Sequence, residues 1–218
     1  MSPRVRPALI VGLTLAAAQQ FGGINTIIYY APTLIQKTGL SASNSIFYSV
    51  AIGVINLVMT VVAVRLVDRM GRRPLLLISL TGMLVMLVLL GFAYVMGMSS
   101  ELALLFMVVY IASFAVGLGP VFWVLVGELF PPSARAAGSG ASTAVNWASN
   151  FVVSLLFLPL ADAIGQGETF WIFAAVVLFA LWFVGRYVPE TRDREFDEVE
   201  AALQGRFGKK PQAGQASY

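Results

Sequence analysis

Six long apolar runs, separated by short polar segments, dominate the pattern of hydrophobic and polar positions along the 218-residue chain. A run of about 20 apolar residues is long enough to cross the hydrocarbon core of a bilayer as an α-helix. The runs cover residues 8–36, 45–67, 74–96, 102–127, 138–160 and 169–188. The pattern therefore predicts an all-α membrane protein with six transmembrane helices. Because the connecting segments are short, successive helices are expected to run antiparallel and to pack as neighbours.

The composition changes after Pro189, where a charged stretch begins. Phe196, Val199 and Leu203 recur in this stretch at helical spacing, which is typical of an amphipathic helix. No apolar periodicity remains in the last eleven or so residues. We therefore expect a six-helix transmembrane bundle over residues 1–188, a cytoplasmic amphipathic helix over residues 189–207 and a disordered tail over residues 208–218.

The charged residues are few and follow the order of the predicted helices. Only 11% of the residues are charged and 58% are hydrophobic, whereas a soluble domain has about 25% charged residues. Placing both termini in the cytoplasm leaves Lys37 as the only one of the 14 basic residues on the outer side, in agreement with the positive-inside rule. The net charge of +3 is thus explained by topology, and no nucleic-acid partner is expected. The sequence predicts an integral, multi-pass protein of the plasma (inner) membrane, with the lipid bilayer around it.

Residue types that carry most enzyme and metal chemistry are missing from the chain. It contains no cysteine and no histidine, so the usual zinc ligands are absent. No nucleophile stands beside a base, and no pair of carboxylates lies in the middle of a span, as an active site would require. We therefore expect no enzyme, no metal site and no cofactor.

Amide side chains lie in the middle of the first span. Gln19, Gln20 and Asn25 are costly to leave unpaired there, so they should face a partner helix or a wet cavity. On a regular helix Gln20 and Asn25 would lie about 140° apart. The adjacent Gly22 and Gly23 predict an interruption that brings them together, because transporters often use discontinuous helices at the bilayer midplane.

Two interpretations of these polar residues remain open. Amides that offer two donors and an acceptor suit a neutral polyhydroxylated ligand, and Trp123 and Trp147, in the interior of two spans, could stack on a sugar ring. Intramembrane amides also serve as hydrogen bonds between helices, and tryptophans pack in cores. A binding site is favoured because these amides and tryptophans fall on only a few helices. Further residues expected to line it are Tyr29, Asn56, Thr60, Asn146 and Asn150.

Three further motifs lie in or between the spans. Gly117, Gly119 and Pro120 interrupt the fourth span, because proline removes a backbone donor and clashes with the preceding turn. The interruption is interpreted either as a gating hinge or as a packing notch for a neighbouring helix. The segments 68–73 and 128–138 carry charges of both signs on the predicted inner face. Glu128 is expected to pair with Arg72 or Arg73, and Asp68 with Arg135, as a latch between helix ends.

Together these motifs resemble a known family. Q-Q-x-x-G-x-N-x-x-x-Y-Y in the first span and D-R-x-G-R-R after the second are followed by G-P-x-x-W-x-x-x-x-E-x-F-P-x-x-x-R-x-x-G, then N-W, then P-E-T-R after the sixth. Their order and spacing are similar to those of the sugar porter family of the major facilitator superfamily, specifically its C-terminal six-helix half. One difference is P-E-T-R-D, where the family usually has P-E-T-K-G.

The resemblance implies transmembrane transport of a monosaccharide, a hexose or a pentose, by alternating access. It implies that one group of residues binds the sugar: Gln19, Gln20, Asn25, Asn56, Trp123, Asn146 and Trp147. Tyr29 and Tyr30 match the extracellular gate, to which the helix interruption adds Gly119 and Pro120. A cytoplasmic salt-bridge network is implied for Asp68, Arg72, Arg73, Glu128, Arg135 and Glu190.

The family pattern also implies a partner. Such transporters contain about twelve helices, and their N-terminal half supplies a further sugar-binding glutamine and any proton-coupling acid. We therefore expect this chain to work with an N-terminal six-helix half or to associate with itself, and proton co-transport is not readable from it. The alternative function is a sugar sensor or truncated remnant that binds sugar without transporting it.

Overall fold

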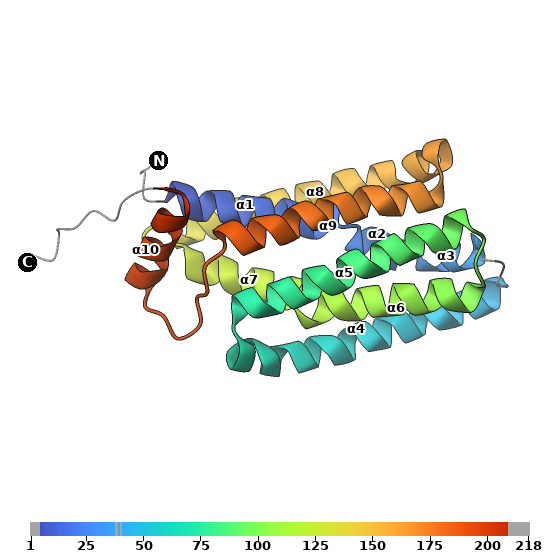
Figure 1. Ribbon diagram of the computed structural model, residues 1–218, viewed down its shortest axis with the longest axis horizontal. Coiled ribbons are helices and arrows are strands. Elements are labelled where there is room, and N and C mark those ends of the chain that lie inside the picture. Colours follow the sequence, from blue (N-terminus) through green and yellow to red (C-terminus); the bar gives the residue numbers. More distant parts are fainter. Residues whose placement is uncertain (1–4, 38, 40, 209–218) are drawn as a thin grey trace, which may run out of the picture.

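The computed structural model describes residues 5–37, 39 and 41–208, and each regular element in this part of the chain is a helix (Figure 1). The helices are α1 (Arg6–Phe21), α2 (Ile24–Tyr29), α3 (Ala31–Lys37), α4 (Ala42–Met70), α5 (Arg72–Val95), α6 (Ser100–Val116), α7 (Leu118–Leu129), α8 (Arg135–Ile164), α9 (Gln166–Tyr187) and α10 (Phe196–Arg206). The segment predicted as a disordered tail lies, apart from Gly208, outside the described residues.

Six stretches of helix in the described residues are long and apolar enough to cross a membrane. They are Arg6–Tyr29, Ser43–Met70, Arg72–Val95, Ser100–Leu129, Arg135–Ile164 and Gln166–Tyr187. The prediction of six spans is confirmed. The first of these stretches contains α1 and α2 and the fourth contains α6 and α7, so these two spans are each built from more than one helix.

The turn after the second span is much shorter than the six-residue connector that hydropathy indicates. Helix α4 continues to Met70 and α5 begins at Arg72, so Gly71 alone joins them. Gly71 has a φ of +92°, and a Cβ there would lie 2.6 Å from Oε2 of Glu190. Only glycine adopts this conformation without strain. Hydropathy marks the end of the apolar run, whereas the helix itself continues through the charged residues that follow.

The six spans pack side by side (Figure 1), in an order that keeps the second and fifth spans apart. Helix α5 packs between α6 and α9, α1 packs against α8 and α9, and α4 packs against α6. Among the described residues, α4 and α8 make no contact with each other. They are also the least buried of the six spans. Helices α2 and α7 each contact both α4 and α8, and the surface between α4 and α8, over these two helices, is called the open face below.

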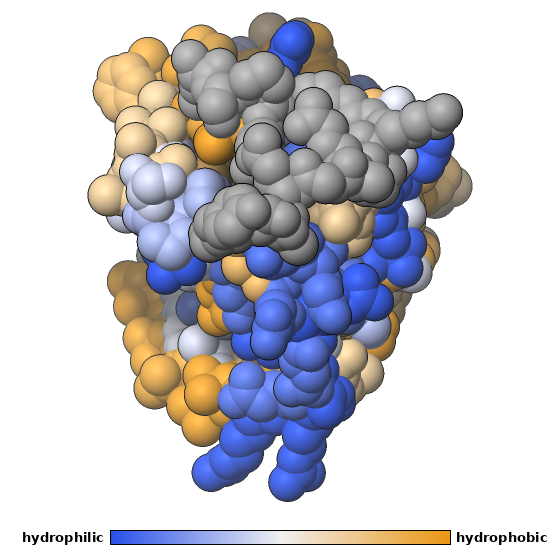
Figure 2. Space-filling view, turned by 90° about the vertical axis from the view of Figure 1, so that its left-hand side faces the viewer, coloured by the Kyte–Doolittle hydropathy of each residue, from blue (hydrophilic) through white to orange (hydrophobic). Residues whose placement is uncertain are grey.

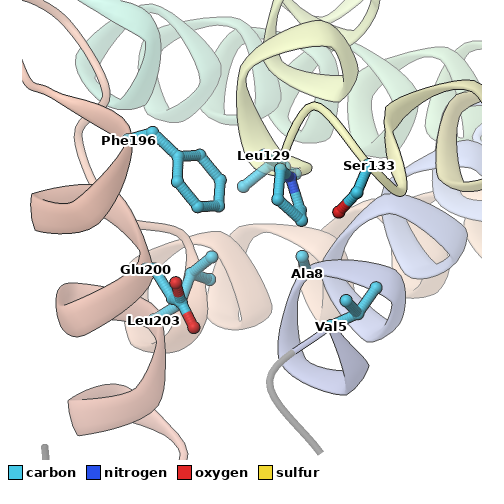
Figure 3. A pocket seen from close by; sticks show the side chains of 8 residues that line it. Val5, Ala8, Leu129, Ser133, Phe196, Glu200 and Leu203 are labelled. Carbon is cyan, nitrogen blue, oxygen red and sulfur yellow. The ribbon is translucent and has the colours of Figure 1, made fainter. Parts of the chain in front are cut away.

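Helix α10 closes one end of the bundle. Its Val199 and Leu203 are buried, and the helix contacts α1, α7 and α9. A cavity of about 250 Å³ remains beneath it, where Phe196 faces Leu129 and Ala8 (Figure 3). Figure 2 looks at this end of the molecule, where hydrophilic residues gather between hydrophobic flanks. The apolar spacing seen in the sequence thus docks α10 on the bundle.

Candidate functional site

The first span is interrupted at the two glycines in its middle. Helix α1 ends at Phe21, and Gly23, which precedes α2, has a φ of +89°. The interruption leaves the carbonyl of Gly22 free of helical bonding, and the buried hydroxyl of Tyr110 donates to it at 2.7 Å. This is the discontinuous helix that the sequence predicts. It keeps its backbone satisfied through a side chain from α6, as a break inside a membrane requires.

A β-carbon at the interruption should be poorly tolerated. In Gly23→Ala the new Cβ would lie 2.3 Å from Cδ2 of Phe173, in a left-handed backbone conformation. We expect the free energy of unfolding to fall by about 1–3 kcal/mol, measured by thermal unfolding in detergent. The control is Gly53→Ala in α4, where no described atom lies within 4 Å of the new Cβ. That control should be neutral or stabilising, and equal melting temperatures of Gly23→Ala and wild type would contradict the prediction.

The interruption brings the mid-membrane amides into one hydrogen-bonded network. Nδ2 of Asn25 donates to Oε1 of Gln20 at 2.9 Å, and Nε2 of Gln20 donates to Oδ1 of Asn146 at 3.0 Å. Nδ2 of Asn146 donates in turn to Oε1 of Gln19 at 2.7 Å. Four amides from α1, α2 and α8 thus share donors and acceptors. The two residues that a regular helix would hold apart are in direct contact.

The same network reaches the second interruption, between α6 and α7. Nε2 of Gln19 donates to the carbonyls of Leu118 and Gly119 at 3.1 and 3.3 Å. The backbone N–H of Leu118 donates to Oγ of Ser79 at 2.9 Å. Leu118 is the first residue of α7, so its N–H has no partner within the helix and Ser79 supplies one, while Gln19 adds a bond to carbonyls at the start of the same helix. The two interruptions are therefore tied to each other, by Gln19 from one side and by Tyr110 from the other.

The sequence motif around Gly117 is interpreted either as a gating hinge or as a packing notch, and the structure shows close helix packing at Gly117. A Cβ on Gly117 would lie 2.4 Å from Cβ of Ser79 and 2.5 Å from the carbonyl oxygen of Leu75. Helix α5 therefore approaches α6 closely at this point. A gating hinge at Gly119 and Pro120 stays a prediction.

The predicted sugar-binding residues divide into a buried group and an exposed group. Gln19 and Asn146 are 2% and 1% exposed, and their amides are used by the network. Trp123 and Trp147 are 46% and 57% exposed. Asn25 is half-buried and lies between the two groups. A ligand approaching from the open face would therefore meet aromatic surfaces and Asn25 before the inner amides.

Other predicted lining residues lie outside this network. Asn56 is half-buried on α4, where its carbonyl accepts the hydroxyl of Thr60, and none of the described hydrogen bonds joins its side chain to the four amides. Oδ1 of Asn150 accepts from Ser154 in its own helix. The structure therefore brings Gln19, Gln20, Asn25 and Asn146 together but leaves the other amides apart.

The two neighbouring tyrosines differ in their surroundings. Tyr30 donates from its hydroxyl to the carbonyl of Ser154 at 3.2 Å, and its ring stacks on Phe157 with centroids 5.4 Å apart. Tyr29 is exposed. Of the pair, Tyr29 thus has the more exposed ring, while Tyr30 joins the end of α2 to α8.

A charge cluster lies at the C-terminal end of α7, away from the helix interruption at Gly117. Nη2 of Arg72 lies 2.7 Å from Oε1 of Glu128, and its Nε lies 3.2 Å from both carboxylate oxygens. The hydroxyl of Thr191 donates to Oε2 of the same carboxylate at 2.5 Å. Of the two predicted partners for Glu128, the structure selects Arg72. This ion pair joins α5 to α7.

Glu190 is expected in the salt-bridge network, but its carboxylate binds backbone N–H groups instead of an arginine side chain. Its carboxylate accepts the backbone N–H groups of Arg72 at 2.9 Å and Arg73 at 3.1 Å, at the start of α5. It also accepts the N–H groups of Thr191 and Arg192. A carboxylate at a helix N-terminus satisfies unpaired donors and favours the helix dipole. The segment after α9 therefore caps α5.

The predicted pairing of Asp68 with Arg135 is not the one in the structure. Asp68 lies 3.7 Å from Arg72 in the next helix, and Nε of Arg135 donates to the carbonyl of Phe130 at 3.4 Å. The reason is the short turn at Gly71, which holds the end of α4 next to the start of α5 and so brings Asp68 near Arg72. Arg73 donates to the carbonyl of Gly185 instead of to a carboxylate.

Three residues that hold the site together were missed by sequence reasoning. Thr191 stands inside the P-E-T-R motif, so the motif itself could have drawn attention to it. Ser79 and Tyr110 lie in uninterrupted apolar runs and give no local signal. Their role depends on the helix interruptions opposite them.

Six membrane-spanning helices, two of which pair at mid-membrane interruptions, form one half of a major facilitator fold. The chain belongs to the sugar (and other) transporter family, whose model matches residues 1–203. Members of this family are transporters and not enzymes. Transport by them needs no cofactor, and in the residues that the structure describes no three acidic, cysteine or histidine side chains gather to hold a metal.

Similar proteins and structures cover nearly all of this chain. It is 41% identical over 210 residues to the probable metabolite transport protein CsbC of Bacillus subtilis, which is 94% of this chain and 46% of the relative. It is 36% identical over 200 residues to the D-xylose-proton symporter of Escherichia coli, covering 88% and 40%. The structure of the proton:xylose symporter XylE bound to 6-bromo-6-deoxy-D-glucose matches with a TM-score of 0.82 and 35% identity, over 89% of this chain and 42% of XylE. The chain spans less than half the length of these relatives.

Proposed function

We propose that this chain forms the C-terminal half of a monosaccharide transporter and supplies half of its sugar site and its inner salt-bridge gate. The observation that carries the proposal is the network of four amides that joins both helix interruptions and lies beside the open face with Trp123. Neutral donors and acceptors next to an exposed indole suit a sugar, whose hydroxyls bind amides and whose C–H face stacks on an aromatic ring. Relatives described as transporters of D-xylose and glucose support a pentose or hexose.

The open face between α4 and α8 supports the proposal of a partner. Large apolar side chains on both helices are exposed there, among them Leu57 and Phe151. An N-terminal six-helix half would cover this face and complete a cavity at the bilayer midplane, as in alternating-access transporters. We further propose that both termini and α10 lie on the cytoplasmic side of the plasma (inner) membrane, because 13 of the 14 basic residues then satisfy the positive-inside rule.

The proposed site is tested by uptake of radiolabelled D-xylose and D-glucose into cells that express the transporter containing this chain. Gln20→Ala and Trp123→Phe should each reduce uptake at low sugar concentration about tenfold, because each removes a contact worth roughly 1–3 kcal/mol. Matched controls are Gln36→Ala and Trp182→Phe, which change an exposed amide and an exposed indole away from the site. Surface abundance is measured for each variant.

Two outcomes would contradict this proposal. Uptake unchanged in both site variants at equal abundance would remove the residues from the sugar site. Binding of sugar without counterflow in liposomes would identify the protein as the alternative, a sugar sensor that does not transport.

A further inference from the structure

Four arginines from different elements meet where α9 ends. Arg73 lies in the first turn of α5, Arg186 in the last turn of α9, Arg194 in the linker that follows and Arg206 in the last turn of α10. Nη2 of Arg73 donates to the carbonyl of Gly185 at 2.8 Å, and Nη1 of Arg206 donates to the carbonyl of Arg186 at 3.3 Å. Two guanidinium groups therefore bind successive carbonyls at the C-terminus of one helix, where the dipole favours cations.

These positive charges are not paired with carboxylates in the part of the chain that the structure describes. Burial, together with the charges of Arg73, Arg186 and Arg194, lowers the pKa of Arg206. Within residues 5–37, 39 and 41–208, no ion pair joins any of the four arginines to a carboxylate. In addition, Nε of Arg73 is buried without a hydrogen-bond partner. The cluster thus retains both charge and donor capacity for an anion.

Two acidic residues near the cluster in sequence are engaged elsewhere. The carboxylate of Glu190 accepts the N–H groups at the start of α5. Asp193 pairs with Arg192 at 2.9 Å. Glu195 follows Arg194 directly, but none of the described ion pairs joins it to the cluster either, so the guanidinium groups can receive an external anion.

The cluster lies at the level where α9 leaves the apolar region. Exposed residues of α9 include Ile172, Phe179 and Arg186, at intervals of seven that place them on one stripe of the helix. Trp182 is exposed beside this stripe, and its ring contacts Tyr187 with centroids 5.8 Å apart. Tryptophan and tyrosine gather at membrane interfaces. Arg186 therefore lies at headgroup depth, at the end of an apolar stripe.

An apolar groove lies further along α9, on the side of α1. It has a volume of about 440 Å³ and runs between α1 and α9, lined by Leu13, Thr14, Ala17, Ala18, Phe21, Val176 and Phe179. Phe179 precedes Arg186 by seven residues, which is about 10 Å along a helix. A molecule with a phosphate at the arginines and a hydrocarbon chain would fit both features at once.

We propose that Arg73, Arg186, Arg194 and Arg206 bind the phosphate of an anionic phospholipid whose acyl chain lies in the groove between α1 and α9. Basic pockets between transmembrane helices bind such headgroups through charge and hydrogen bonds. The lipid would fix the end of α9 to α5 and α10, and so hold the elements that carry Glu190 and Thr191. This site is separate from the amide network and does not depend on sugar transport.

Native mass spectrometry of the 218-residue chain in a nonionic detergent tests the proposal. Phosphatidylglycerol is titrated against phosphatidylcholine, and the bound fraction is measured for each lipid. The wild-type chain should bind phosphatidylglycerol in preference to phosphatidylcholine. The double variant R186Q/R206Q should bind phosphatidylglycerol about tenfold more weakly than wild type. The control R65Q/R69Q removes two exposed charges from the end of α4, which does not contact α9, and should keep wild-type binding. Equal phosphatidylglycerol binding by R186Q/R206Q and wild type would overturn the proposal.

A second comparison separates a lipid from a free anion. Ala17→Phe should fill the groove and weaken phosphatidylglycerol binding while leaving the arginines in place. Inorganic phosphate at the same concentration should not displace the lipid. If inorganic phosphate displaces it, or if Ala17→Phe binds the lipid as wild type does, the acyl-chain part of the proposal is wrong. Thermal unfolding of each variant confirms that it is folded before its binding is scored.

Discussion

Replacing Gln19 with alanine is expected to lower the free energy of unfolding by about 3 kcal/mol. Its buried amide donates to the carbonyls of Leu118 and Gly119 and accepts from Nδ2 of Asn146. The change removes three hydrogen bonds of a buried side chain, each worth about 1 kcal/mol, and leaves one donor of Asn146 without its partner on Gln19. The effect is larger than that of a surface amide because Gln19 serves both helix interruptions.

The measurement is thermal or denaturant unfolding of the purified chain in detergent. Gln36→Ala serves as the control, because Gln36 is an exposed amide at the end of α3 and should change the free energy by less than about 0.5 kcal/mol. Conservative replacement by glutamate should also destabilise the chain, since a carboxylate cannot donate to two carbonyls. If Gln19→Ala unfolds like Gln36→Ala, the network does not hold the interruptions together.

Glu128→Gln is expected to destabilise the chain by about 2 kcal/mol. The side chains of Glu128 and Arg72 are 31% and 13% exposed, and the guanidinium makes three contacts with the carboxylate. Removing the charge leaves the more buried Arg72 without its partner, which is the costly step for a buried pair. Because Glu128 remains partly solvated, the loss should stay below the 3–5 kcal/mol of a fully buried pair.

A double-mutant cycle isolates the pair. Arg72→Gln should be similarly destabilising, and the double variant should lose less than the sum of the two single changes. The matched control is Asp193→Asn, which neutralises an exposed ion pair with Arg192 and should cost less than about 0.5 kcal/mol. Strict additivity of the two single changes would show that the contact between Arg72 and Glu128 contributes no coupling.

Sequence reasoning singled out the motifs of the candidate site but did not predict all their contacts. The choice of Arg72 over Arg73 as partner of Glu128 depends on the turn at Gly71, which sets the direction of each arginine at the start of α5. The capping of α5 by Glu190 joins residues 118 positions apart. No periodicity links such positions, because the linker after α9 reaches α5 only when the bundle is assembled.

The sequence by itself determined the number of spans, the interruption at Gly22 and Gly23, and the set of amides and indoles near mid-membrane. These follow from local properties: the length of an apolar run, the missing side chain of glycine and the cost of an amide in hydrocarbon. The tertiary structure decided which amides pair with which, since Asn146 and Gln19 are 127 residues apart. It also decided the roles of Ser79 and Tyr110, because a hydroxyl in an apolar run gains a purpose only when another helix presents an unpaired backbone group to it.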